Sequence, residues 1–111
     1  MGRSVTTGDF DGDGIVDLAI GASGVYPASD QTGKVLGYLG PVVPGQYTAA
    51  DATFVIQGEN VYDMFGTALA TVDADGDALD DLVVGAQGWN GGQGKVYLFH
   101  AADVLDGGLR W

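Results

Sequence analysis

The chain has 111 residues, of which 15 are acidic and 4 are basic, so its formal net charge is −11 at pH 7. So few basic residues exclude binding to a nucleic-acid phosphate backbone, and a hydrophobic content of 46% excludes a disordered acidic tail. The absence of cysteine excludes disulfides and thiolate metal sites, and the apolar runs are too short to cross a membrane as helices.

The first half of the chain predicts short strands separated by glycine-rich turns. A first strand is expected at about residues 3–7 and a second at 16–20, with an aspartate-rich loop between them. A third strand is expected at 34–39 and a fourth at 52–57. Helical periodicity is absent, and residues 101–105 are expected to form a single helical turn at most.

The second half of the chain repeats this order. The run Asp9-x-Asp11-x-Asp13 recurs 64 residues later as Asp73-x-Asp75-x-Asp77, and Gly33-Lys34-Val35 recurs 61 residues later as Gly94-Lys95-Val96. The corresponding strands are expected at residues 67–72, 82–84 and 95–99. Residues 109–111 are expected to begin a truncated fourth strand.

Repeated four-stranded units of about 60 residues predict an all-β fold built from β-propeller blades. The chain then holds about 1.75 antiparallel blades, one over residues 1–64 and one over 65–111. Because a ring needs roughly four to eight blades, closure requires either self-assembly of copies or the remaining blades of a longer propeller. The apolar runs are nearly continuous, so both sheet faces are expected to be covered, with Val55, Val96 and Leu98 in the core.

The two aspartate loops predict two calcium sites. Carboxylates at loop positions 1, 3, 5 and 9, with a backbone carbonyl at position 7, form an oxygen-only donor set that favours calcium over zinc or copper. The predicted ligands are Asp9, Asp11, Asp13, Ile15 and Asp17 in the first loop, and Asp73, Asp75, Asp77, Leu79 and Asp81 in the second. Asp80 falls between ligand positions and is expected to face solvent or a turn.

Besides a calcium-binding loop between strands, the aspartate spacing has three other interpretations. A helical EF-hand loop is excluded, because position 12, where it needs a glutamate, is occupied by Ile20 and Val84. Magnesium ranks second because it demands stricter octahedral geometry. Solvated Asp–Gly turns without a metal are the third alternative. A structural role for calcium is favoured over a sensory one, since each loop joins two adjacent strands.

The combined motifs resemble the FG-GAP repeat, which builds the β-propeller of integrin α subunits and many bacterial surface proteins. The resemblance rests on Phe65-Gly66, the second aspartate loop, residues 82–86 and residues 94–97, and it covers essentially the whole chain. It implies that the loop between the first and second strands of each blade binds calcium through the eight aspartates given above. Met1, in place of an aromatic residue, departs from the family pattern, as do Ser23 and Gln87 in place of proline.

The resemblance implies a non-enzymatic, structural and adhesion-type module of an extracellular or cell-surface protein. It also implies a protein or glycan ligand on the face opposite the calcium loops, which would carry Tyr26, Tyr62 and Trp89, with Asp63 and Asn90 beside them. The alternatives are a lectin-like propeller and the accessory domain of a surface hydrolase. His100 is the only histidine and lies near no nucleophile motif, so no catalytic residue is predicted, and no signal peptide is expected.

Overall fold

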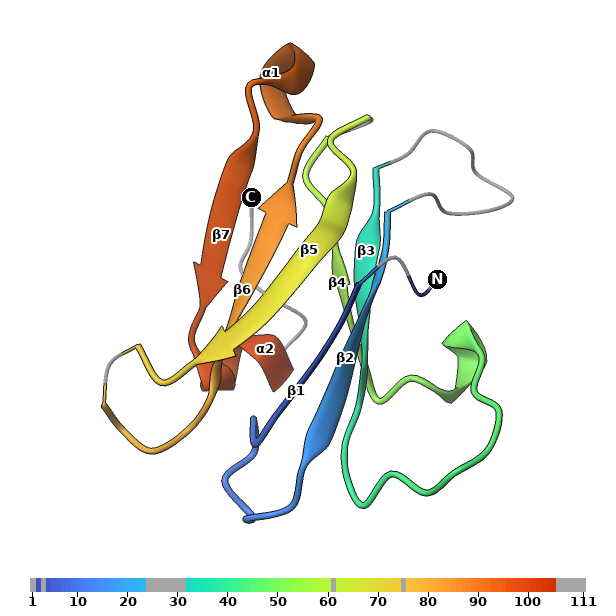
Figure 1. The fold of residues 1–111 in the computed structure, drawn as a ribbon, viewed down its shortest axis with the longest axis vertical. Coiled ribbons are helices and arrows are strands. Elements are labelled where there is room, and N and C mark those ends of the chain that lie inside the picture. The colour runs from blue at the N-terminus through green and yellow to red at the C-terminus, as the bar shows by residue number, and fades with distance from the viewer. Residues whose placement is uncertain (1, 3, 24–31, 61, 75, 106–111) are drawn as a thin grey trace.

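The computed structural model describes residues 2, 4–23, 32–60, 62–74 and 76–105 (Figure 1). These residues form two antiparallel sheets, of which the first has the strand order β1-β2-β3-β4 and the second β5-β6-β7. The strands of the first sheet are β1 (Ser4–Gly8), β2 (Asp17–Ala22), β3 (Lys34–Tyr38) and β4 (Phe54–Gln57). Those of the second are β5 (Phe65–Val72), β6 (Asp81–Ala86) and β7 (Lys95–Phe99).

The strand register confirms the predicted all-β meander. Gly8 pairs with Asp17 and Val72 pairs with Asp81, so each aspartate loop closes a β-hairpin. The observed strand ends differ from the predicted ones by at most two residues, and β7 coincides with its prediction. The expected fourth strand of the second unit lies outside the described residues.

Helical structure is confined to three short segments of the described chain. A 3₁₀ turn, η1 (Ala49–Asp51), precedes β4, and α2 (Ala101–Leu105) follows β7 as the predicted single turn. The segment α1 (Trp89–Gly92) is also short and contains the left-handed residues Asn90 and Gly91. Among the described residues, no helix is long and apolar enough to span a membrane.

The two sheets share one hydrophobic core. β1 and β5 lie side by side (Figure 1). The buried side chains between the two sheets are apolar. Burial of each large side chain there stabilises the fold by about 1.5–3 kcal/mol. The buried residues of this core are Phe10, Ala19, Val35, Phe54, Ile56, Phe65, Leu82, Val84, Ala86, Tyr97, Phe99 and Val104.

The prediction that both sheet faces are covered was wrong for part of the molecule. Val55, Val96 and Leu98 are 42%, 70% and 47% exposed, because burial alternates along β4 and β7. Successive strand residues point to opposite faces, and only one face of the second sheet meets the first sheet. The other side of this sheet remains exposed in the described chain.

Glycines permit close approach where the two sheets meet. An added Cβ at Gly21 would lie 2.0 Å from the carbonyl oxygen of Gly66, and one at Gly33 would lie 2.1 Å from the carbonyl oxygen of Phe65. The hydroxyl of Ser4 donates a hydrogen bond of 2.8 Å to the same Gly66 oxygen. The Phe65-Gly66 dipeptide therefore packs directly on the backbone of the first sheet. A side chain at Gly21 or Gly33 would block this contact.

Candidate metal centre

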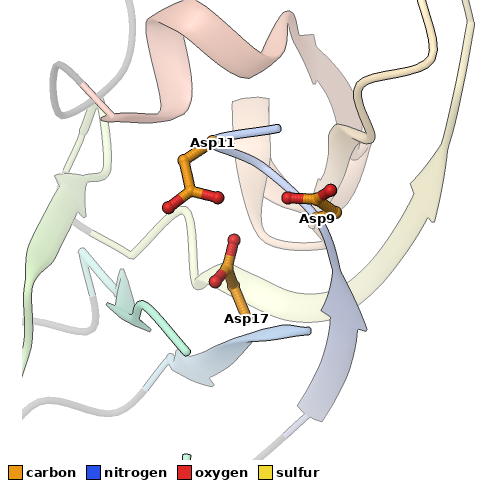
Figure 2. Close-up of side chains that lie close together, drawn as sticks. All are labelled: Asp9, Asp11 and Asp17. Atoms are coloured by element: carbon orange, nitrogen blue, oxygen red, sulfur yellow. The ribbon is translucent and has the colours of Figure 1, made fainter. Parts of the chain in front are cut away.

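The first aspartate loop gathers three carboxylates around one point. Asp9 directly follows β1 and Asp17 begins β2, so the hairpin register brings the two ends of the loop together. Figure 2 shows Asp9, Asp11 and Asp17 pointing toward one another, and their carboxylate oxygens lie within 4.8 Å of each other. Two further predicted ligands, Asp13 and Ile15, are exposed on the same loop, and the Asp13 carboxylate is not part of this cluster.

Backbone N–H groups hold the carboxylates of this loop in place. The N–H groups of Gly12 and Gly14 donate to the two oxygens of Asp9, at 2.8 and 2.9 Å. The N–H of Ile15 donates to Asp13 at 2.8 Å. Gly12 and Gly14 have φ values of +77° and +80°, which glycine adopts without strain. The loop conformation is therefore set by its own sequence.

Asp17 is fully buried and accepts two backbone hydrogen bonds. The N–H of Phe10 donates to its Oδ2 at 2.9 Å, and the N–H of Gly40 donates to its Oδ1 at 2.7 Å. Each carboxylate oxygen has more than one lone pair, so these bonds leave acceptor capacity for a cation. Asp17 therefore links the loop to the start of the segment that follows β3.

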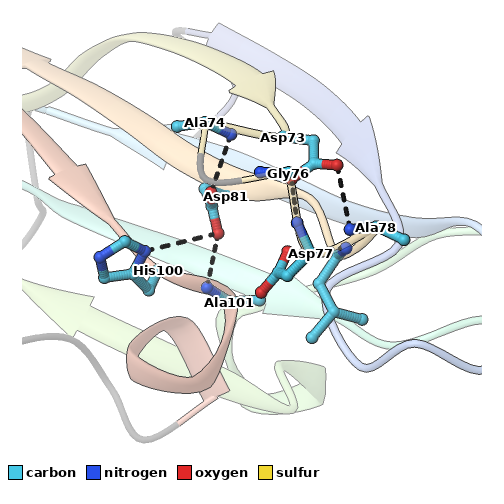
Figure 3. A network of polar contacts seen from close by, with 9 residues as sticks. Asp73, Ala74, Gly76, Asp77, Ala78, Asp81, His100 and Ala101 are labelled. Atoms are coloured by element: carbon cyan, nitrogen blue, oxygen red, sulfur yellow. Dashed lines mark hydrogen bonds and ion pairs between the residues drawn. The ribbon is translucent and has the colours of Figure 1, made fainter.

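Asp81 has the same environment in the second repeat. It is fully buried, and the N–H groups of Ala74 and Ala101 donate to its two oxygens at 3.0 and 2.9 Å (Figure 3). The Nδ1 atom of His100 lies 4.0 Å from Asp81 Oδ1, and the His100 side chain is 60% exposed. Because the equivalent residues Asp17 and Asp81 have the same surroundings, the sequence repeat is also a structural repeat.

The second loop is built on the same scaffold. The N–H groups of Gly76 and Ala78 donate to the two oxygens of Asp73, each at 3.0 Å (Figure 3). The N–H of Leu79 donates to Asp77 at 3.0 Å, as that of Ile15 does to Asp13. The predicted ligand Asp75, which corresponds to Asp11, lies outside the described residues.

The carboxylates of the first loop perturb one another. Partial desolvation raises the pKa of the Asp11 carboxyl, and the negative charges of Asp17 and Asp13 raise it further. Desolvation would also raise the pKa of Asp9, but the hydrogen bonds from the Gly14 and Gly12 N–H groups lower it below its usual value. A cation among these groups would relieve their repulsion. The all-oxygen donor set fits a hard cation such as calcium.

Asp80 faces the turn of the other repeat, a partner that its position between ligand positions did not predict. Its carboxylate is half-buried and accepts a hydrogen bond of 2.8 Å from the backbone N–H of Asp9, while its own N–H donates to the Asp9 carbonyl at 3.0 Å. The side chain of Leu79 also reaches the first loop, where an added Cβ on Gly12 would lie 2.6 Å from Leu79 Cδ2. The two aspartate loops are therefore in direct contact, which no local sequence signal indicated.

The predicted ligand face lies at the other end of the sheets. α1 and the start of β5 lie opposite the two aspartate loops (Figure 1). Tyr62 is 64% exposed, whereas Trp89 packs against the core and Lys95 Nζ lies 5.0 Å from its ring centre. Asp63 is buried and accepts a hydrogen bond of 3.1 Å from the amide of Asn60. Tyr26 lies outside the described residues.

Comparison with known proteins places the chain among repeats of this architecture. The chain is 41% identical over 86 residues to integrin alpha-PS2 of Drosophila melanogaster and 38% identical over 86 residues to integrin alpha-V of Gallus gallus, with 78% of this chain covered in each case. It is 32% identical over 109 residues to phosphatidylinositol-glycan-specific phospholipase D of Mus musculus, with 92% of this chain covered. The alignments cover only 5%, 7% and 13% of these proteins.

The sequence profile of the FG-GAP repeat matches residues 1–38 and residues 65–99. These two segments contain β1, β2 and β3 of the first sheet and β5, β6 and β7 of the second, together with both aspartate loops. The two matches therefore coincide with the two structural repeats, and the chain belongs to the FG-GAP repeat family.

Proposed function

We propose that the chain is a calcium-binding β-propeller module with a structural, adhesion-type role in an extracellular or cell-surface protein. The convergence of Asp9, Asp11 and Asp17 within 4.8 Å carries this proposal. The repetition of the same backbone scaffold around Asp73 and Asp81 supports a second site. The integrin relatives support the adhesion-type role and the location.

Each proposed site joins the two strands of one hairpin. In the first repeat, residues 1–64, Asp9 and Asp17 stand at the ends of β1 and β2, and in the second, residues 65–111, Asp73 and Asp81 stand at the ends of β5 and β6. Bound calcium would supply positive charge between these ends and would be coordinated by oxygen atoms from both of them. Two calcium ions would reduce the formal net charge of −11 to −7.

A thermal melt in calcium and in EGTA tests the proposal. At free calcium 100 times the dissociation constant, each site stabilises the folded state by about 2.7 kcal/mol, so Tm is expected to rise in calcium. Asp11→Asn removes a predicted ligand that accepts a hydrogen bond of 3.3 Å from the Asp13 N–H. We expect this variant to bind calcium roughly tenfold more weakly by isothermal titration calorimetry.

Asp103→Asn is the matched control, because it removes the same charge in α2, outside both loops. It should keep the calcium affinity of the parent chain. Equal Tm values in calcium and EGTA would contradict the proposal. An equal response to magnesium and calcium would replace calcium with a less selective divalent site.

A protein or glycan ligand is proposed for the end of the sheets opposite the calcium loops. The exposed ring of Tyr62 supports this assignment, since exposed aromatic side chains suit both kinds of ligand. Trp89, a second predicted ligand residue, lies beside Lys95, whose Nζ is 5.0 Å from the centre of its ring. A glycan array tests the lectin-like alternative, which fails if the chain retains none of the glycans.

The accessory domain of a surface hydrolase is the second candidate. The similarity to phosphatidylinositol-glycan-specific phospholipase D favours it, and catalytic residues would then lie outside this chain. Hydrolysis of a glycosylphosphatidylinositol substrate by the chain alone would contradict the accessory role and the non-enzymatic assignment together.

A further inference from the structure

We propose that Asp80 couples the two proposed calcium sites, so that calcium in the second aspartate loop strengthens calcium binding in the first. This inference rests on the proposed calcium-binding function and adds a regulation to it. The first loop is defined as residues 9–17 and the second loop as residues 73–81. Asp80 belongs to the second loop, but its carboxylate contacts Asp9, a predicted ligand of the first site.

Two contacts from the second loop end at Asp9 or at the group that orients it. The Asp80 carboxylate accepts a hydrogen bond of 2.8 Å from the Asp9 N–H, and the Asp80 N–H donates to the Asp9 carbonyl at 3.0 Å. The side chain of Leu79 packs on Gly12, where an added Cβ would lie 2.6 Å from Leu79 Cδ2. The N–H of Gly12 in turn donates to Asp9 Oδ1 at 2.8 Å. The second loop therefore holds both the backbone of Asp9 and the residue that orients its carboxylate.

The residues that make these contacts lie inside the second predicted site. The Leu79 carbonyl and the Asp81 carboxylate are both predicted calcium ligands, and Asp80 stands between them in the chain. The N–H of Leu79 also donates to Asp77, another predicted ligand, at 3.0 Å. Calcium bound in the second loop would hold the residues on both sides of Asp80. It would thereby restrict the conformations of Asp80 to those that can accept the hydrogen bond from Asp9.

Order gained at one site lowers the entropic cost of binding at the other. Without calcium, the two loops must be ordered against the mutual repulsion of the nine acidic residues that they contain. Once calcium orders the second loop, the contact between Asp80 and Asp9 needs less additional ordering, so the first loop binds calcium at a lower free-energy cost. By linkage, calcium in the first loop strengthens the second site by the same factor.

Direct repulsion between the two bound cations acts in the opposite direction. This repulsion is screened by salt, with a Debye length of about 8 Å at about 0.15 M ionic strength. The contacts of Asp80 with Asp9 and of Leu79 with Gly12 are direct and are not screened in this way. At this ionic strength we therefore expect positive coupling of roughly threefold to tenfold, the range that one net hydrogen bond provides.

Amide signals in two-dimensional NMR can follow each loop separately. The N–H groups of Gly12 and Gly14 lie in the first loop and those of Gly76 and Ala78 in the second, and each donates to the first aspartate of its own loop. Their chemical shifts in a calcium titration therefore give the calcium concentration that half-saturates each loop.

Asp75→Asn weakens the second site by removing one of its predicted ligands. If the sites are coupled, this substitution should raise the calcium concentration that half-saturates the first loop by roughly threefold or more. Asp103→Asn, the charge-matched control in α2, should leave that concentration unchanged.

The substitution Asp75→Asn is then combined with Asp80→Ala and, separately, with Asp80→Asn. Both changes at Asp80 remove one negative charge, but only Asp80→Asn keeps an oxygen that can accept from the Asp9 N–H. We expect Asp75→Asn to keep most of its effect on the first loop beside Asp80→Asn and to lose it beside Asp80→Ala.

Leu79→Ala tests the other contact between the loops. It removes the side chain that packs on Gly12 but keeps the Leu79 carbonyl and every charge. In this background the effect of Asp75→Asn on the first loop should shrink. This variant also keeps the inference testable if Asp80→Ala does not fold, which the dispersion of the amide signals shows.

The outcomes separate the coupling from the calcium sites themselves. A first-loop response to Asp75→Asn that persists beside Asp80→Asn and disappears beside Asp80→Ala supports the inference. Saturation of both loops with no first-loop response to Asp75→Asn, or with an equal response beside either change at Asp80, overturns the coupling alone. If Asp80→Ala does not fold, an undiminished response beside Leu79→Ala overturns it. Amide signals that ignore calcium in both loops contradict the proposed function and the coupling together.

Discussion

Asp80 links the two aspartate loops by contacting Asp9, which lies 71 residues earlier in the chain. Its carboxylate and its N–H exchange hydrogen bonds with the backbone N–H and carbonyl of Asp9, the first residue of the first aspartate loop. The backbone groups of Asp9 are therefore satisfied from the other repeat. This makes Asp80 a positioning residue for the first proposed calcium site, although it belongs to the second loop.

We expect Asp80→Ala to lower the free energy of unfolding by about 1–2 kcal/mol, because it leaves the half-buried Asp9 N–H without its acceptor. Asp80→Asn retains a side-chain oxygen at this position and should lose less than half of that stability. Urea unfolding in EGTA measures both variants without a contribution from calcium. Equal stability of Asp80→Ala and the parent chain would show that the bond between the loops adds nothing.

At the scale of elements, Glu59 fastens the segment between β4 and β5 to β7. One oxygen of Glu59 accepts hydrogen bonds from Lys95 Nζ at 3.1 Å and from the Tyr97 hydroxyl at 2.7 Å. The hydrogen bond from Tyr97 and, to a smaller extent, that from Lys95 lower the pKa of the Glu59 carboxyl below its usual 4.5. Burial raises the pKa of the Tyr97 hydroxyl most, and its hydrogen bond to the negatively charged Glu59 raises it further.

This lowered pKa makes part of the stability dependent on pH. A carboxyl whose pKa is lower in the folded state stabilises the fold above its unfolded pKa and loses that contribution as pH falls through its folded pKa. We expect Glu59→Gln to be less stable than the parent chain at pH 7, with the difference shrinking below about pH 4.5. Urea unfolding at several pH values measures it. A difference that stays constant from pH 7 to about pH 3 would contradict this assignment.

At the scale of the whole molecule, the distribution of acidic residues matters more than their number. Nine of the 15 acidic residues fall in residues 9–17 and 73–81. The hydrogen bonds between Asp80 and Asp9 bring these two segments to the same end of the sheets. The fold therefore concentrates negative charge that the extended chain would keep apart.

Salt should relieve this repulsion in the absence of calcium. Raising NaCl from about 0.01 M to about 1 M shortens the Debye length from about 30 Å to about 3 Å. We expect Tm in EGTA to rise over this range, and to rise less in saturating calcium, because bound cations already neutralise the loops. Differential scanning calorimetry measures both series. The same salt dependence with and without calcium would argue against cations in the loops.

Local patterns predicted the repeat and much of the candidate site. Strands and Asp–Gly loops are specified within a few residues of sequence, so the hairpins around Asp9 and Asp73 follow from spacing alone. The positive φ values of Gly12 and Gly76 fit the same local logic. The exposure of Val96 did not follow, since an apolar strand residue gives no indication of whether a second sheet covers its face.

The sequence by itself determined the family, the strand order and which carboxylates stand in each loop, because these features depend on residues close together in the chain. Only the tertiary structure decided that Asp80 reaches Asp9 and that Gly21 is covered while Gly85 is open. Those contacts join residues about 45 to 71 positions apart. Such pairs are fixed by how the two sheets pack, so equivalent residues of the two repeats have different surroundings in the described chain.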